Sequence, residues 1–451
     1  MAVPSPPPPV DLTGGGSLPS VFAVSDLAQA SVGAAGASLA GLAALDGGRA
    51  RAVSVDRDLA SAWFASSIRP SGWSPPAAWD AIAGDYATSD GWIRLHTNAP
   101  HHRAAAVAAL GVPGDRVAVA EAVAAWTAEG LEEAVVAGGG AAAAMRTAAA
   151  WDAHPQGRAV AGEALVRVDR TSAAPAGKRS GRGDRPLEGV RVLDLTRVLA
   201  GPVATRLLAG WGAEVLRIDP PNWDEPPIVP EVTLGKRCAR LDLRLPAGRD
   251  HLLALLASAD VLVHGYRSDA LEGLGIGADR RDDARPGLVD VSLDAYGFTG
   301  PWATRRGFDS LVQMSSGIAD AGMRAEGTDH PVPLPVQALD HATGYLLAAA
   351  AISGIALRRT DGVGSRWRTS LARMARLLVD AGVGTVPDGD GVPPVPPQAS
   401  GPVERTAWGD ARRLPPPVSV EGAPLRWNLP AGPLGSSEPG WIADRGGSGR
   451  P

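Results

Sequence analysis

The sequence predicts an α/β protein in which a parallel sheet forms the larger of two domains. First, short apolar segments alternate with helical segments of roughly ten residues between positions 187 and 382, which is typical of parallel strands joined by right-handed helical crossovers. Second, 451 residues exceed the size of one ordinary hydrophobic core, which predicts two domains. Third, 45% of the residues are hydrophobic and 20% are charged, which excludes a wholly disordered chain.

The first 186 residues divide into four segments. Residues 1–19 are rich in Pro and Gly and are predicted to be disordered. Residues 20–64 hold an Ala-rich helical stretch followed by a short strand. Residues 65–170 contain the strand-like DGWIRLH and several helical stretches, which predict a small α+β domain. Residues 171–186 are small, basic and polar, as expected of a linker.

Residues 187–382 carry the predicted parallel sheet. The expected strands are, in order, GVRVLDL, AEVLRID, RCARLDL, DVLVHGY, PGLVDVSLDAYG and SRWRTSL, and the helices between them include GPVATRLLAGWG and PAGRDHLLALLASA. Residues 383–404 are a Pro/Gly spacer, and residues 405–451 are a closing segment and tail that keeps three tryptophans and is expected to pack in part.

Composition argues against several function classes. The net charge of −5 argues against nucleic acid as a partner. A single cysteine, Cys238, excludes internal disulfides and Cys-based zinc sites and fits a cytoplasmic location. No uninterrupted apolar run reaches the ~18 residues of a membrane helix, so no membrane partner is expected. The histidines lack metal-ligand spacing, and we expect His101 and His102 to be exposed polar residues at a helix start.

Three common nucleotide or hydrolase motifs are missing from the sequence. The turn after the first strand of the large domain, TRVLAGPVAT, lacks the Gly-x-Gly-x-x-Gly of a dinucleotide site. No P-loop and no Gly-x-Ser-x-Gly elbow occurs. An isolated acid, Asp340, stands instead at the start of a helix in LPVQALDHATGYLLAAAA. The residues alone leave two interpretations open, namely an N-cap or a carboxylate nucleophile toward an activated acyl group.

From Pro186 onward the chain resembles the family III CoA-transferases of the CaiB/BaiF type, which include formyl-CoA transferase, carnitine CoA-transferase and 2-methylacyl-CoA racemase. The resemblance covers residues 186–378 and rests on five blocks in family order, namely PLEGVRVLDLTRVLAGPVATRLLAGWGAEVLRID, GKRCARLDLRLPAGRDHLLALLASADVLVHGYR, PGLVDVSLDAYGFTGPWATRRGFDSLVQMSSGI, PLPVQALDHATGYLLAAAA and TDGVGSRWRTSLA. It implies a Rossmann-like large domain. Residues 65–170 resemble the family's small domain, and residues 20–64 resemble a second, partial copy of the nucleophile-helix region. The chain therefore looks like two incomplete family units fused in permuted order.

The resemblance implies a CoA-transferase in which Asp340 is the covalent nucleophile. Acyl-CoA and a carboxylic acid would be the substrates, with coenzyme A as a substrate and no metal or organic cofactor. A homodimer is the family's usual assembly, and the permuted order also allows a self-contained monomer. By motif match, the CoA-binding positions are Leu199, Ala200, Leu241, Asp242, Leu243, Arg244, Gly265, Tyr266, Arg267, Arg306, Gly307, Phe308 and Asp309.

Two alternatives accompany this interpretation. A racemase of the family carries a His before the Asp of a Gly-x-Asp triplet, and Phe308 stands there in this chain, which disfavours racemisation. A catalytically inactive CoA-binding or scaffold protein is the other alternative, because Pro220 and Gly273 replace arginines that relatives keep for CoA. Asp26 occupies the position of a second nucleophile in the partial copy, and we interpret it as a core or N-cap residue.

Overall fold

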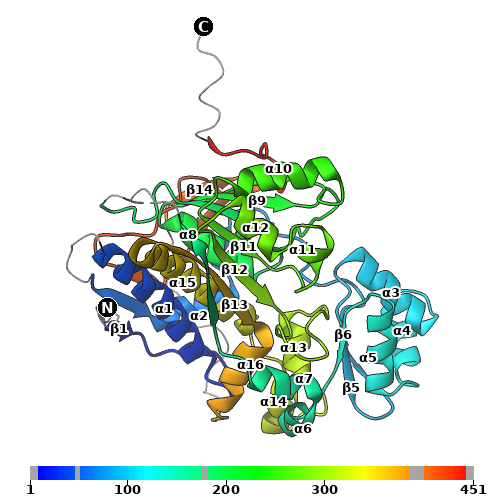
Figure 1. Ribbon diagram of the computed structural model, residues 1–451. Helices are drawn as coiled ribbons and strands as arrows, with labels where there is room; N and C mark the ends of the chain where they lie inside the picture. The colour runs from blue at the N-terminus through cyan, green and yellow to red at the C-terminus, as the bar shows by residue number, and fades with distance from the viewer. Residues whose placement is uncertain (1–8, 46–50, 175–180, 182, 386–400, 443–451) are drawn as a thin grey trace.

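The computed structural model describes residues 9–45, 51–174, 181, 183–385 and 401–442 (Figure 1). A seven-stranded sheet forms its centre, with the strand order β10-β9-β8-β11-β12-β13-β7. The strands are β7 (Arg167–Ala173), β8 (Arg191–Leu195), β9 (Glu214–Asp219), β10 (Lys236–Arg240), β11 (Val261–His264), β12 (Val289–Asp294) and β13 (Val363–Ser370). The six strands from β8 to β13 are parallel, and their order reverses between β8 and β11. The predicted α/β class with a Rossmann-like parallel sheet is confirmed.

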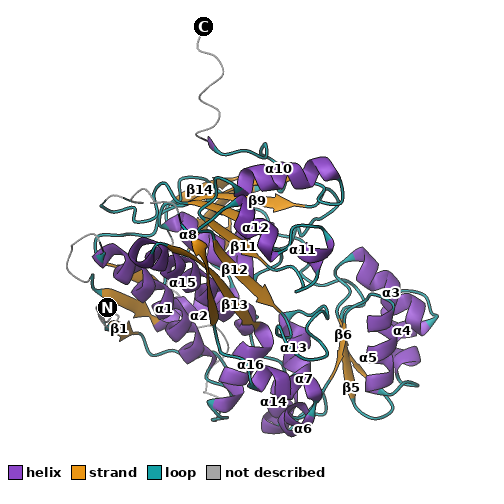
Figure 2. Ribbon diagram, viewed as in Figure 1, coloured by secondary structure: helices purple, strands orange, loops and turns teal. Residues whose placement is uncertain are grey.

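Helices cover both faces of this sheet (Figure 2), which explains the apolar residues of its inner strands β8 and β11. Because successive side chains of a strand point to opposite faces, Val192 of β8 packs with α8 and α15, whereas Leu193 packs with α10. The covering helices are α8 (Ala200–Gly210), α10 (Pro246–Leu256), α12 (Ala278–Ala284), α15 (Ala338–Asp361) and α16 (Leu371–Asp380).

The small residues of α15 let this helix approach its neighbours closely. A Cβ atom on Gly344 would lie 2.4 Å from the carbonyl oxygen of Ala200 on α8. A Cβ atom on Gly354 would lie 2.3 Å from Cγ1 of Val289 on β12. Both separations are far below van der Waals contact, so the small-residue pattern fixes the course of α15 across the sheet. This course brings the N-terminus of α15 to the carboxyl end of the sheet, where α8 begins.

A small α+β domain occupies residues 80–146 and has its own core. Its antiparallel sheet consists of β4 (Gly84–Ala87), β5 (Trp92–Leu95) and β6 (Ala142–Ala144). The helices α3 (Pro100–Leu110), α4 (Arg116–Val123) and α5 (Ala128–Ala137) pack on it around Ile82, Ile93 and Leu131. Figure 1 shows this domain in cyan at one side of the large sheet.

The chain returns from the small domain through β7, which pairs antiparallel with β13 at the sheet edge. Residues 171–173, expected at the start of the linker, are therefore the end of a strand of the large sheet. Of the remaining linker positions, 175–180 and 182 lie outside the described residues, as do 386–400 of the expected spacer. The division into domains and linker beyond these points stays a prediction.

The N-terminal segment is more ordered than its composition predicts. Residues 10–13, expected to be disordered, form β1 (Val10–Thr13), which pairs with β2 (Val53–Asp56); β2 pairs in turn with β16 (Val418–Val420). Alternating side chains of these short strands pack against α1 (Val24–Ala44), and burial of α1 against α15 holds the unit on the large domain. The expectation of disorder is wrong for these residues, whereas residues 1–8 lie outside the described residues.

The two similar helices of the partial repeat lie side by side, with Ser353 of α15 3.4 Å from Ser38 of α1 (Figure 1). Among the described residues, α1 is the one helix whose length and apolar composition would suffice to cross a membrane, and 61% of that stretch is buried within the protein. The sequence analysis expects no such helix, because no uninterrupted apolar run reaches the required length of ~18 residues.

Shorter elements complete the fold. They are α2 (Arg57–Ala65), β3 (Ile68–Pro70), α6 (Ala148–Ala153), α7 (Pro155–Ala161), α9 (Val229–Val232), α11 (Ala270–Gly273), α13 (Asp309–Ser315), α14 (Ile318–Glu326), β14 (Val403–Thr406) and β15 (Gly409–Arg413). The closing segment packs in part, as expected, since β15 pairs with β3 and the ring of Trp441 is buried against α10.

Candidate active site

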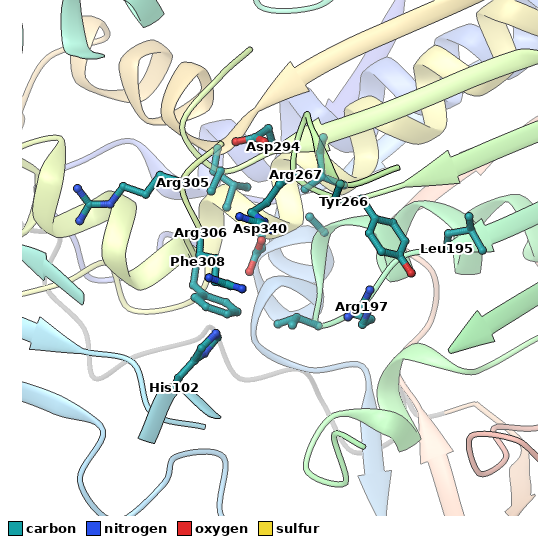
Figure 3. Close-up of a pocket in the computed structure, with 18 of the residues that line it drawn as sticks. His102, Leu195, Arg197, Tyr266, Arg267, Asp294, Arg305, Arg306, Phe308 and Asp340 are labelled. Atoms are coloured by element: carbon teal, nitrogen blue, oxygen red, sulfur yellow. The ribbon is translucent and has the colours of Figure 1, made fainter. Parts of the chain in front are cut away.

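A cavity of about 370 Å³ lies at the carboxyl ends of β8, β11 and β12, where the strand order reverses (Figure 3). Ligands of open α/β sheets bind at such a position because the loops diverge there and leave a crevice. The walls come from both domains, and the lining residues are His101, His102, Leu195, Arg197, Val198, Ala200, Trp223, Gly265, Tyr266, Arg267, Ala270, Leu293, Asp294, Ala295, Arg305, Arg306, Gly307, Phe308, Asp340 and Leu371.

Asp340 lies in the first turn of α15 and lines this cavity. Its side chain makes no capping hydrogen bond, and the N-cap position is Gln337. The interpretation of Asp340 as an N-cap is therefore wrong. The residue is 8% exposed, so its carboxyl group is withdrawn from bulk water but remains at the cavity wall.

Asp309, which lies on another helix, caps the N-terminus of α15. It begins α13, is fully buried, and accepts the backbone N–H of Asp340 at 2.9 Å. Its other oxygen accepts the side-chain amide of Gln313. Asp309 was expected to bind CoA, but it does not line the cavity. It instead fixes the backbone that carries Asp340.

Burial raises the affinity of both carboxyl groups for protons. Burial raises the pKa of Asp340 well above its usual value, and the neighbouring charge of Asp309 adds to this effect. Burial also raises the pKa of Asp309, against the hydrogen bonds that it accepts from the backbone of Asp340 and from Gln313. Asp340 therefore becomes an anion only when cations or higher pH favour its ionised form.

Three arginines without a carboxylate partner in the described part of the chain line the same cavity: Arg197, Arg267 and Arg306. The guanidinium of Arg197 lies 5.1 Å from the Trp223 ring and 4.8 Å from the Tyr266 ring. Arg267 donates from Nη1 to the carbonyl oxygen of Thr304 at 3.2 Å. Burial and then the charge of Arg267 lower the pKa of Arg306. The charge of Asp269 acts in the opposite direction on Arg306, but none of the three arginines forms an ion pair within the described residues, so the cavity attracts an anionic ligand.

The neighbouring Arg305 has partners and ties the two domains together. It lies 2.9 Å from Glu132 on α5, a buried carboxylate that also pairs with Arg146 at 2.6 Å. The guanidinium of Arg305 lies 3.8 Å from the Trp302 ring. This buried cluster holds the loop that carries Arg306 against the small domain.

The small domain contributes histidines to the cavity wall. His102 is 4% exposed, so the expectation that it would be an exposed polar residue is wrong. His101 beside it on α3 is exposed, as expected, and also lines the cavity. Burial, followed by the charges of His101 and Arg306, lowers the pKa of His102 to about 4, so its imidazole is neutral at pH 7. Figure 3 shows His102 pointing toward Phe308.

The structure brings together some of the expected CoA-binding residues and separates others. Those that line the cavity with Asp340 are Ala200, Gly265, Tyr266, Arg267, Arg306, Gly307 and Phe308. Those that do not are Leu199, Leu241, Asp242, Leu243, Arg244 and Asp309. Four of these residues, 241–244, follow β10, which lies two strands away from β8. In this segment Arg244 pairs with Asp242 at 2.7 Å, and Leu243 is buried in the core. For Leu243, the core interpretation fits the structure.

Several lining residues were not singled out from the sequence. Arg197 and Val198 follow the first strand of the large domain, and Asp294 ends β12, so their places after parallel strands were an available signal. Val198 has a φ of 63°, which a β-branched residue rarely adopts, and its N–H donates to Glu225 at 2.9 Å. No local sequence pattern marks this strain.

The described residues contain no cluster of His, Cys, Asp or Glu arranged to hold a metal ion.

Asp26 lies away from this cavity. It is in the first turn of α1, with 64% of its side chain exposed, and pairs with Arg57 at 2.5 Å. It is therefore neither a core residue nor an N-cap, and α1 offers no counterpart of the walls around Asp340.

Comparison with known proteins shows which family the large domain is similar to. Residues 187–399 match the family model described as CoA-transferase family III. The chain is 32% identical over 193 residues to the Mycobacterium tuberculosis protein named "Probable fatty acyl-CoA transferase Rv3272", covering 40% of this chain and 48% of that protein. It is 34% identical over 193 residues to succinyl-CoA:glutarate CoA-transferase of Mus musculus, covering 40% and 44%.

Solved structures include a similar chain as well. A crystal structure of Rv3272 matches with 29% identity and a TM-score of 0.41, covering 44% of this chain and 59% of that chain. The chain spans about half the length of the curated relatives it matches. Residues 187–399 are therefore similar to CoA-transferase family III.

Proposed function

We propose that the protein transfers CoA from an acyl-CoA to a free carboxylic acid, with Asp340 as the covalent nucleophile. The observation that carries this proposal is the placement of one buried carboxyl group in a cavity whose arginines lack carboxylate partners in the described part of the chain. A carboxylate so placed can attack an acyl carbon, and the arginines can hold an anionic substrate against it. The similarity of residues 187–399 to CoA-transferase family III supports the same chemistry.

The proposed reaction proceeds in four balanced steps. The Asp340 carboxylate attacks the thioester carbonyl, the C–S bond breaks, and CoA leaves as a thiolate beside a mixed anhydride. The thiolate attacks the Asp340 carbonyl carbon and releases the first acid as a carboxylate, which leaves an aspartyl-CoA thioester. The acceptor carboxylate attacks that thioester to form a second anhydride and free the thiolate. The thiolate finally attacks the acceptor's carbonyl and regenerates Asp340. No metal or organic cofactor takes part.

The cavity's charges suit both the substrate and the nucleophile. CoA carries several phosphate charges, and each arginine fork can form two parallel hydrogen bonds to a phosphate. Because burial and Asp309 oppose ionisation of Asp340, the positive charges of Arg267 and Arg306 in the same cavity are needed to favour the anion that must attack.

Racemisation is the second candidate, because His102 brings an imidazole into the cavity that sequence reasoning did not anticipate. The physical chemistry opposes it. A pKa of about 4 makes His102 a weak base toward an α-proton at neutral pH. His341, the other nearby histidine, stacks on Phe64 of α2 at 5.0 Å and does not line the cavity. Phe308 has no titratable proton.

Mass spectrometry of the protein after mixing with a panel of acyl-CoAs tests the proposal. We expect a covalent CoA adduct on the peptide that contains Asp340, and its loss in Asp340→Ala. The matched control is Asp26→Ala, which removes the exposed aspartate of the similar helix α1 and should keep the adduct. An adduct that persists in Asp340→Ala would refute the proposed nucleophile. CoA binding without any adduct would favour the inactive CoA-binding protein.

A further inference from the structure

We propose, resting on the transferase function above, that His102 selects acyl groups that carry a hydroxyl or carboxyl substituent over unsubstituted alkyl chains. Nothing in the chemistry of the transfer steps requires a histidine, so the presence of this side chain in the wall needs a different explanation. The inference concerns the acyl group and leaves the role of Asp340 unchanged.

The unusual feature of His102 is a buried ring without hydrogen bonds. The residue is 4% exposed, and neither Nδ1 nor Nε2 has a hydrogen-bond partner within the described residues. The side chain nevertheless lines the cavity that holds Asp340. An unpaired buried polar group lowers stability, and native proteins satisfy nearly all such groups with protein, water or ligand.

Because other rings surround His102, a hydrogen-bond partner for its imidazole would have to come from the cavity. The Phe308 ring lies at 5.7 Å in an edge-on arrangement, and the His101 ring lies at 4.1 Å. His96, at 6.5 Å, stacks on Phe308 at 3.7 Å and shields that side of the wall. Rotation about the last side-chain torsion of a histidine is soft, so a small turn brings a ring nitrogen to the cavity surface.

A neutral imidazole suits a polar substituent on the acyl chain. It donates from one nitrogen and accepts at the other, so it can pair with a hydroxyl in either direction and with a carboxylate through its N–H. The guanidinium of Arg306 lines the same cavity and would favour a carboxylate further. An unsubstituted chain would leave the ring unpaired, and sites built to hydrogen-bond a substrate strongly reject analogues that lack the matching group.

The test compares acyl groups of equal length in the first half-reaction, which needs no acceptor. Single-turnover formation of the enzyme–CoA adduct is followed by mass spectrometry with butyryl-CoA, 3-hydroxybutyryl-CoA and succinyl-CoA. We expect the second-order rate constant for adduct formation to be at least ~10-fold higher for a polar acyl group than for butyryl-CoA. In His102→Phe, which keeps a planar ring of similar size, this preference should fall to about 2-fold or less.

Two further variants make the outcome specific. His102→Gln restores a donor and an acceptor and should recover part of the preference. His330→Phe alters an exposed histidine outside the cavity and should match the wild type. Equal rates for all three acyl-CoAs in the wild type, or an unchanged preference in His102→Phe, would overturn this inference while leaving the transferase intact. Failure of the proposed function itself would show as no adduct with any acyl-CoA.

Discussion

Replacing Asp294 by Asn should stabilise the protein increasingly as the pH rises. Asp294 ends β12 at the cavity, is 4% exposed, and burial raises its pKa to about 8. One of its oxygens accepts the N–H of Tyr296 at 3.0 Å, and the other has no partner within the described residues. An Asn can keep the first hydrogen bond and never ionises.

The magnitude follows from the difference between the folded and unfolded chains. An ordinary aspartate has a pKa of 3.8, so between 3.8 and about 8 the folded protein keeps a proton that the unfolded chain releases. Stability contributed by this group therefore falls as the pH rises through that window, by about 1.4 kcal/mol for each pH unit. At pH 7 the loss amounts to about 4 kcal/mol relative to a neutral side chain.

Urea unfolding of the wild type and Asp294→Asn at pH values from 4 to 8 measures this difference. Groups common to both proteins cancel, so the gap in unfolding free energy should be near zero at pH 4 and about 4 kcal/mol at pH 7. Asp250→Asn, at an exposed position on α10, is the matched control for loss of one carboxylate. A gap that stays constant with pH would refute the reasoning, because it would mean that Asp294 is ionised in the folded protein.

Three further outcomes are expected. Asp309→Asn removes the negative charge next to Asp340 but keeps an acceptor for its backbone N–H. The pH range over which adduct formation rises should therefore move to lower pH, and an unmoved pH profile would exclude this coupling. Glu132→Gln leaves Arg146 and Arg305 buried without their shared carboxylate and should lower the unfolding free energy by about 3–5 kcal/mol, checked by urea unfolding; a loss under ~1 kcal/mol would contradict the buried pairing. Incubation with a chiral 2-methylacyl-CoA in D2O should leave C2 free of deuterium, and exchange at C2 with loss of optical purity would favour the racemase.

The parallel sheet could be predicted because four of its six parallel strands, β8, β9, β11 and β12, carry an apolar signal of their own. Burial on both faces makes the first three residues of the strand Val261–His264 apolar, and helices of ordinary length separate the strands. The seventh strand could not be predicted in the same way. Arg167–Ala173 is a largely exposed edge strand with the polar sequence RVDRTSA, and its partner β13 lies almost 200 positions further along the chain.

A site residue could be predicted only where it directly follows a predicted strand or matches a family motif. Asp340 could be named from the resemblance, and its place in the first turn of a helix agrees with the structure. The roles of Asp309 and His102 depend on contacts between elements far apart in the sequence, namely α13 with α15 and the small domain with the large one. A helix-start histidine looks solvent-exposed in its local sequence, because the surface that buries it belongs to another domain.

The two walls of the cavity are joined through one polypeptide, which has a consequence for the stability of the cavity's shape. Every residue that lines it, from His101 to Leu371, comes from a single polypeptide, and the buried cluster around Glu132 holds the two walls together. The shape of the cavity is thus set by intramolecular contacts, whose effective concentration does not change on dilution. A single copy of the chain therefore supplies walls from both domains around Asp340.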